Sequence, residues 1–144
     1  MRLTLVRHAE SEGNLKGIIQ GHADYPLSRQ GIKQSESLAR YLQTSVFYER
    51  KLTTFYSSPL KRALETAEKV SACLEVPFQE KEILKEVDAG IFSGLTWEEI
   101  GHQYPDIQKA FKQTLEFSVV PQGESRANLW KRAEQFWTFL HHNH

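Results

Sequence analysis

The sequence predicts an α/β protein, a three-layer α/β/α sandwich with a mostly parallel sheet. Short β-prone runs alternate along the chain with longer runs whose apolar residues recur at helical spacing, which is typical of successive βαβ units. The first run, residues 3–6, is apolar throughout, as expected for a strand covered on both faces. With 144 residues, 40% of them hydrophobic and 25% charged, residues 1–144 are expected to form a single domain.

Two helices flank the second predicted strand. Ser28 is a suitable N-cap for the first helix, in which Ile32, Leu38, Ala39 and Leu42 follow at roughly helical spacing. Residues 53–57 are β-branched and aromatic and are expected to form the strand, and Pro59 suits the first position of the next helix. The inner face of that second helix is predicted to consist of Ala63, Ala67, Val70 and Leu74.

The C-terminal half predicts one short strand and three helices. Residues 76–79 favour a strand, and Thr96 and Glu99 have the spacing of a capping box, so a helix should begin there. Tyr104 and Pro105 interrupt this helix, and another short helix follows. The last helix has an apolar face made of Leu129, Ala133, Phe136, Trp137 and Leu140.

The composition limits the partners that we expect. Eighteen basic and eighteen acidic residues cancel, so the whole molecule has no field that attracts nucleic acid or an anionic membrane. The single cysteine, Cys73, cannot form an intrachain disulfide. The sequence contains neither a run of about 18 apolar residues, as a membrane span would need, nor a signal-peptide pattern. We therefore predict a cytoplasmic protein that binds neither nucleic acid nor membrane.

Arginine and histidine residues lie where ligands bind in α/β proteins. Arg7 and His8 follow the first predicted strand, and Arg62 lies in the first turn of a helix that follows the second. A guanidinium group can bind phosphate oxygens with two hydrogen bonds, and a neutral imidazole is a nucleophile that can accept a phosphoryl group. A helix N-terminus also favours anions. These residues together predict a phosphate site.

The chain resembles the histidine phosphatase superfamily, which has the phosphoglycerate-mutase-like fold. The resemblance rests on these segments, in the family's order and approximate spacing: Leu-Val-Arg-His-Ala-Glu-Ser-Glu-Gly-Asn at residues 5–14, Gln20-Gly21, Asp24-Tyr25-Pro26-Leu27, Gly31, Ser58-Pro59-Leu60-Lys61-Arg62, Leu84-Lys85-Glu86, Gly90, Gly94 and Gly123-Glu124-Ser125. The resemblance implies a phosphomonoester hydrolase acting on small phosphorylated metabolites through a phosphohistidine, with no metal or cofactor.

The resemblance also implies a role for individual residues. His8 would be the nucleophile, Arg7 and Arg62 the phosphate clamp, and Glu86 the proton donor. The substrate pocket would also be lined by Asn14, Gln20 and Gly21. To hold a proton near neutral pH, Glu86 would need a partly desolvated setting, for which Ile83, Val87, Ile91 and Phe92 are candidates. The walls that determine specificity are expected to include Tyr25, Phe92 and Trp97.

One part of the family pattern is not found. The family has a second histidine in a His-Gly pair after a further strand, whereas His141, His142 and His144 directly follow the last helix and are expected to be solvated. The C-terminal strands of the fold are therefore expected to be missing, either because the sequence is truncated or because the protein is a shortened relative with weakened catalysis. An unpaired sheet edge would favour association into a homodimer.

The sequence supports other functions less well than a phosphatase. A metal hydrolase is disfavoured because no His-Glu-x-x-His or Asp-x-Asp motif occurs and His22 and His102 are isolated, and the P-loop of an NTPase is absent as well. Phosphoglycerate mutases share the same machinery, but residues 17–21 and the short segment between Gly94 and Gly123 favour a phosphatase. An inactive pseudoenzyme that only binds phosphate through Arg7 and Arg62 remains an alternative.

Overall fold

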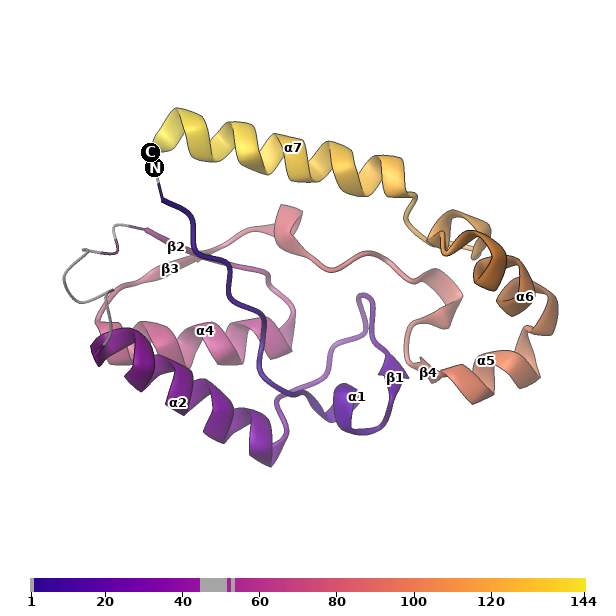
Figure 1. The fold of residues 1–144 in the computed structure, drawn as a ribbon, viewed down its shortest axis with the longest axis horizontal. Helices are drawn as coiled ribbons and strands as arrows, with labels where there is room; N and C mark the ends of the chain where they lie inside the picture. The colour runs from indigo at the N-terminus through magenta and orange to yellow at the C-terminus, as the bar shows by residue number, and fades with distance from the viewer. Residues whose placement is uncertain (1, 45–51, 53) are drawn as a thin grey trace.

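The computed structural model describes residues 2–44, 52 and 54–144 (Figure 1). The elements in chain order are α1 (Glu12–Leu15), β1 (Ile18–Ile19), α2 (Arg29–Thr44), β2 (Phe55–Ser57), α4 (Lys61–Leu74), β3 (Phe78–Glu80), η1 (Glu82–Leu84), η2 (Gly90–Phe92), β4 (Leu95–Thr96), α5 (Trp97–Gln103), α6 (Pro105–Thr114), η3 (Phe117–Val119) and α7 (Arg126–Asn143), where η marks a 3-10 turn.

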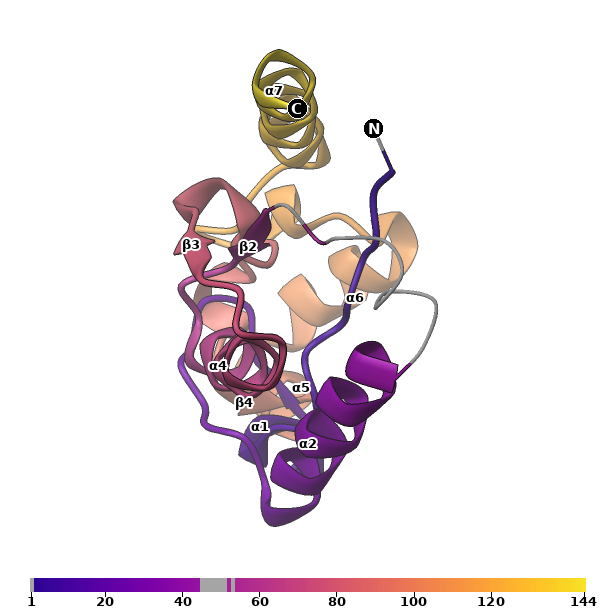
Figure 2. The same ribbon diagram turned by 90° about the vertical axis from the view of Figure 1, so that its left-hand side faces the viewer.

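The strands β2 and β3 lie between layers of helices. They pair in parallel, with Phe55 beside Phe78 and Ser57 beside Glu80. Helix α4, with α2 packed against it, lies on one side of these strands, and α7 lies on the other (Figures 1 and 2). This α/β/α order agrees with the predicted class. The other described strands, β1 and β4, pair antiparallel, so the described strands form two small sheets rather than one continuous sheet.

Most helices begin where the capping signals predict. The backbone N–H of Gly31 donates to Ser28 Oγ at 2.9 Å, which caps α2. Thr96 and Glu99 form the predicted capping box of α5, in which the Thr96 N–H donates to Glu99 Oε2 at 2.7 Å. The prediction for Pro59 is wrong, because α4 begins at Lys61.

The apolar side chains gather in two clusters. Ala39, Leu42 and Val70 are buried between α2 and α4, as their helical spacing predicts. The second cluster packs η2 against α5 and the segment after η3, and its buried members are Ala89, Phe92, Ile100 and Val120.

The prediction that residues 3–6 form a strand is wrong. Residues 2–10 have no strand assignment, and Leu5 is 85% exposed. The physical reason is the lack of a partner: among the described residues, no backbone group of residues 3–7 forms a hydrogen bond with another backbone group. A groove of about 1010 Å³ instead separates this segment from β2, α4 and α7.

The predicted strands at residues 53–57 and 76–79 correspond to β2 and β3, shifted by one or two residues. Thr53 lies outside the described residues. In the part of the chain that the structure describes, no helix is both long and apolar enough to cross a membrane.

Candidate active site

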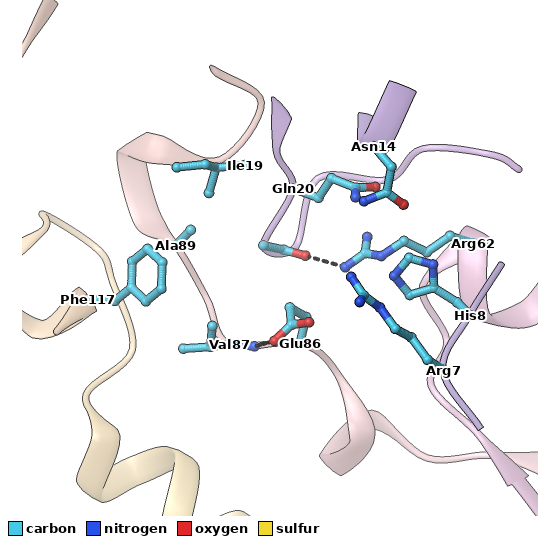
Figure 3. Close-up of a pocket in the computed structure, with 11 residues that line it drawn as sticks. Arg7, His8, Asn14, Ile19, Gln20, Arg62, Glu86, Val87, Ala89 and Phe117 are labelled. Atoms are coloured by element: carbon cyan, nitrogen blue, oxygen red, sulfur yellow. Dashed lines mark hydrogen bonds between the residues drawn. The ribbon is translucent and has the colours of Figure 1, made fainter. Parts of the chain in front are cut away.

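A cavity of about 190 Å³ is lined by all seven residues that the sequence predicts to be catalytic or substrate-binding (Figure 3). These residues come from four separate parts of the chain: Arg7, His8, Asn14, Gln20, Gly21, Arg62 and Glu86. The parts are the N-terminal segment, α1 with the loop after β1, the first turn of α4, and the loop between η1 and η2. The fold therefore assembles the predicted constellation, although residues 3–6 do not form a strand.

His8 is half-buried, and one of its ring nitrogens is engaged. Its Nδ1 lies 2.7 Å from the carbonyl oxygen of Ala9, which can only accept, so Nδ1 carries the proton. The lone pair of Nε2 is then available as a nucleophile. Burial lowers the pKa of His8 below its usual value of 6.5, and the charges of Arg62 and Arg7 lower it further, while the bond to Ala9 opposes this shift. The imidazole is therefore neutral near pH 7.

Arg62 is almost completely buried, with 2% of its surface exposed. It lies in the first turn of α4, as predicted. Its Nη2 donates to Gly21 O at 3.0 Å and its Nη1 to Ala23 O at 3.2 Å. Arg62 thus fixes the loop that follows β1 as well as placing a positive charge in the cavity. The side chain of Arg7, by contrast, is exposed.

A buried serine orients the two amide side chains of the cavity. The Ser11 hydroxyl lies 2.7 Å from Gln20 Oε1, and the Ser11 N–H donates to Asn14 Oδ1 at 3.0 Å. Because both amide oxygens face Ser11, the NH₂ groups of Asn14 and Gln20 remain as donors for the oxygens of a ligand. The neighbouring Gly21 has φ 48°, and a Cβ there would lie 2.7 Å from Ser93 Oγ, so only glycine fits.

Glu86 lies on the loop between η1 and η2, and its side chain is exposed. The expectation of a partly desolvated setting is therefore wrong for this carboxyl group. The four apolar neighbours expected to cover it do not do so: Val87 lines the cavity beside it, whereas Phe92 is buried in the second cluster. Glu86 Oε1 accepts a hydrogen bond from the Val87 N–H at 2.9 Å, which fixes the carboxylate locally.

Two residues that the sequence reasoning did not select hold the Glu86 loop from either side. Arg132 of α7 donates from Nη1 to the carbonyl oxygens of Ile83 at 2.9 Å and Lys85 at 2.6 Å. On the other side, Nε2 of His22 lies 2.8 Å from the carbonyl oxygen of Glu86. His22 therefore has a structural role at this loop.

Both residues also bind a carboxylate through their remaining nitrogen atoms. His22 Nδ1 lies 3.3 Å from Asp88 Oδ2. Arg132 binds Glu124, and this hydrogen bonding lowers the pKa of the Glu124 carboxyl group. The sequence carries a signal for Arg132, since it lies three residues after Leu129 and four before Phe136, at the edge of the apolar face.

The rest of the cavity wall is apolar and consists of Ile19, Val87, Ala89 and Phe117. Of these four, the sequence pointed only to Val87, as a neighbour of Glu86, and the other three were missed. The walls expected from the sequence, Tyr25, Phe92 and Trp97, are not among the residues that line the cavity. Phe92 is instead fully buried in the core, where its ring packs edge-on against Trp97.

The terminal histidines do not line this cavity. His141 packs against Trp137, and Nε2 of His144 lies 2.9 Å from the Tyr56 hydroxyl group. All three terminal histidines are exposed, as the sequence predicts.

Comparisons with known proteins agree with this geometry. The family model described as the histidine phosphatase superfamily (branch 1) matches residues 3–144. The chain is 35% identical over 136 residues to phosphoserine phosphatase 1 of Hydrogenobacter thermophilus, covering 94% of this chain and 62% of that protein. It is 38% identical over 130 residues to 6-phosphofructo-2-kinase/fructose-2,6-bisphosphatase of Gallus gallus, covering 90% of this chain and 26% of that protein.

Solved structures share the fold. Bacillus stearothermophilus YhfR superposes with a TM-score of 0.80 and 30% identity, over 96% of this chain and 66% of that chain. The alpha-ribazole phosphatase of Shigella flexneri superposes with a TM-score of 0.83 and 25% identity, over 95% of this chain and 65% of that chain. The predicted fold class is therefore confirmed. The chain spans about two thirds of the length of these structures.

Proposed function

Since the chain belongs to the histidine phosphatase superfamily (branch 1), we propose that it hydrolyses small phosphomonoesters through a phosphohistidine on His8. The observation that carries the proposal is the geometry at His8: its Nδ1 faces the carbonyl oxygen of Ala9, which leaves Nε2 available in a cavity that two arginines also line. The names of the relatives support hydrolysis over mutase activity, because both include a phosphatase.

Each charged side chain has a role in the proposed reaction. Arg7 and Arg62 bind the phosphoryl oxygens and compensate the charge that builds on them in the transition state. Nε2 of His8 attacks phosphorus in line, so that a P–N bond forms while the P–O bond to the alcohol breaks. Glu86, whose exposed carboxyl group a bound ester would cover, gives its proton to the departing alkoxide oxygen.

The second half of the reaction regenerates the enzyme. Glu86, now a carboxylate, takes a proton from a water molecule, which attacks the phosphohistidine and releases inorganic phosphate. Both halves use the same two arginines, since the same oxygens carry the charge each time. We also propose a cytoplasmic location, which is supported by the single, unpaired Cys73.

The test is to trap the phosphohistidine. The protein is mixed with a reactive aryl phosphate, quenched within milliseconds, and analysed by mass spectrometry under conditions that preserve the acid-labile P–N bond. We expect one phosphoryl group on His8 in the wild type, and none in His8→Ala. His102→Ala is the matched control, because His102 is exposed on α5 and does not line the cavity. Phosphate binding without labelling would indicate a pseudoenzyme instead.

A further inference from the structure

The two ends of the cavity differ in chemistry. Arg7, His8 and Arg62 lie together at one end, whereas Ile19, Val87, Ala89 and Phe117 lie opposite them (Figure 3). These four side chains, which we call the apolar wall, face the space that the alcohol part of a bound phosphomonoester would occupy.

Three residues of the apolar wall belong to the second buried cluster or pack against it. Ile19 and Phe117 both pack against the buried cluster that includes Ala89, and Phe117 also contacts Phe111, with ring centroids 4.8 Å apart. Ile19 is held in the antiparallel pair of β1 and β4. The wall is therefore preformed and presents apolar surface without any rearrangement, which reduces the cost of binding an apolar group.

The apolar wall has no charged group to receive a second anion. Arg7 and Arg62 are the only cationic side chains among the described residues that line the cavity, and both are at the phosphate end. Two donors of Arg62 are already used by backbone carbonyl groups. A second phosphate or a carboxylate at the wall would lose its hydration without gaining a partner, which is costly.

The space beside the apolar wall is small. The cavity has a volume of about 190 Å³, below the range of roughly 300–1,000 Å³ found for drug-sized ligands, although Arg7, His8, Arg62 and Glu86 also line the neighbouring groove of about 1010 Å³. We propose that the substrates are small monophosphates whose alcohol part is apolar and carries no second anionic group, and that Phe117 contacts this part. This inference rests on the proposed function, because it assigns the substrate class of the same site.

Phosphonates test the inference without turnover, because their P–C bond is not cleaved. We would measure the dissociation constants of methylphosphonate, propylphosphonate and 2-carboxyethylphosphonate by calorimetry. Propylphosphonate should bind about 10- to 20-fold more tightly than methylphosphonate, since each buried methylene contributes about a factor of four. The carboxyethyl compound, similar in length but carrying a second anion, should bind no better than methylphosphonate.

Variants of the wall make the test specific. Phe117→Ala should reduce the affinity for propylphosphonate several-fold and leave methylphosphonate unchanged. Val87→Thr keeps the shape of the side chain but replaces a methyl group by a hydroxyl group. It should also reduce the affinity for propylphosphonate, to a smaller extent, and it provides a second test if Phe117→Ala does not fold. Trp130→Ala is the control, because this tryptophan is exposed on α7 and does not line the cavity.

The possible results distinguish the proposed substrate class from the proposed hydrolysis through a phosphohistidine. Equal affinities for the propyl and carboxyethyl compounds, or an equal loss of all three ligands in Phe117→Ala, would overturn the substrate class while leaving phosphohistidine formation unaffected. The expected phosphonate preferences without any labelling of His8 would support the apolar wall and contradict hydrolysis. No binding of any phosphonate would overturn both.

Discussion

Arg132 and Glu124 form a pair of parallel hydrogen bonds, from Nε to Oε1 at 2.7 Å and from Nη2 to Oε2 at 2.8 Å. This geometry leaves Nη1 to bind the carbonyl oxygens of Ile83 and Lys85, so α7 holds the loop that carries Glu86. The pair is partly buried, with 20% and 14% of the two side chains exposed.

We therefore expect Arg132→Met to act on both stability and catalysis. The carboxylate of Glu124 and two carbonyl oxygens lose their donors, so the free energy of unfolding should fall by about 2–4 kcal/mol. Turnover of alkyl phosphates should fall more than that of activated aryl phosphates, because Glu86 is displaced. Denaturant unfolding and the ratio of the two rates are the measurements, with Lys131→Met as the exposed control. If the ratio of alkyl to aryl phosphate turnover is unchanged at equal fractions of folded protein, Arg132 only stabilises the fold.

His22 should contribute to the same positioning from the other side of the loop. Its ring nitrogens face Glu86 O and the Asp88 carboxylate, so His22→Ala removes both contacts. Amide hydrogen exchange of residues 86–90 should become at least several-fold faster. His102→Ala provides the control, since His102 also lies near a carboxylate, that of Glu98, but is exposed on α5. Unchanged exchange in His22→Ala would contradict the role.

Glu86→Gln tests the proton donor directly. An amide of the same size cannot protonate the leaving alkoxide, so alkyl phosphates should be hydrolysed about 100-fold more slowly or worse. Activated aryl phosphates, whose leaving groups hardly need a proton, should lose much less. Steady-state kinetics on both ester classes gives the comparison. An equal loss on both would show that Glu86 is not a general acid.

The two arginines should differ in what they stabilise. Arg62→Ala and Arg7→Ala should each weaken vanadate binding by about 1.5–3 kcal/mol, since each removes a charged donor. Only Arg62→Ala should also reduce the free energy of unfolding substantially, by about 1–3 kcal/mol, because it leaves Gly21 O and Ala23 O without donors. Vanadate titration and urea unfolding of both variants test this. An equal loss of unfolding free energy in Arg62→Ala and Arg7→Ala would contradict this prediction.

The charge of Arg7 should be measurable in the titration of His8. The folded-state pKa of His8 lies below 6.5, so the unfolded chain binds this proton first as the pH falls. Stability linked to His8 is therefore complete above pH 6.5 and decreases as the pH falls from 6.5 through the folded-state pKa. Arg7→Gln removes a charge that lowers the pKa, so the pKa should rise toward 6.5. An NMR titration of the ring resonances, with Arg29→Gln as control, would detect this shift. No shift would mean that the charge of Arg7 does not contribute to the lowered pKa of His8.

The sequence was most informative where residues act locally. Capping residues such as Ser28 and Thr96 predicted the starts of α2 and α5, because a cap depends only on residues three positions away. The resemblance selected seven of the eleven residues that line the cavity, namely Arg7, His8, Asn14, Gln20, Gly21, Arg62 and Glu86. The apolar wall was missed because Phe117 reaches the cavity through the packing of η3 on α6, which no local pattern encodes. Residues 3–6 were misassigned because apolar composition favours a strand but does not supply its partner.

The hydrogen bond between His8 Nδ1 and Ala9 O also has a stereochemical consequence. Because it leaves Nε2 as the sole nucleophilic atom, a phosphoryl group that passes through His8 would be received and released at the same nitrogen. Each in-line displacement inverts the configuration at phosphorus. Two successive inversions restore it, so an ester made chiral with oxygen isotopes would transfer its phosphoryl group with overall retention, whereas direct attack by water would give inversion.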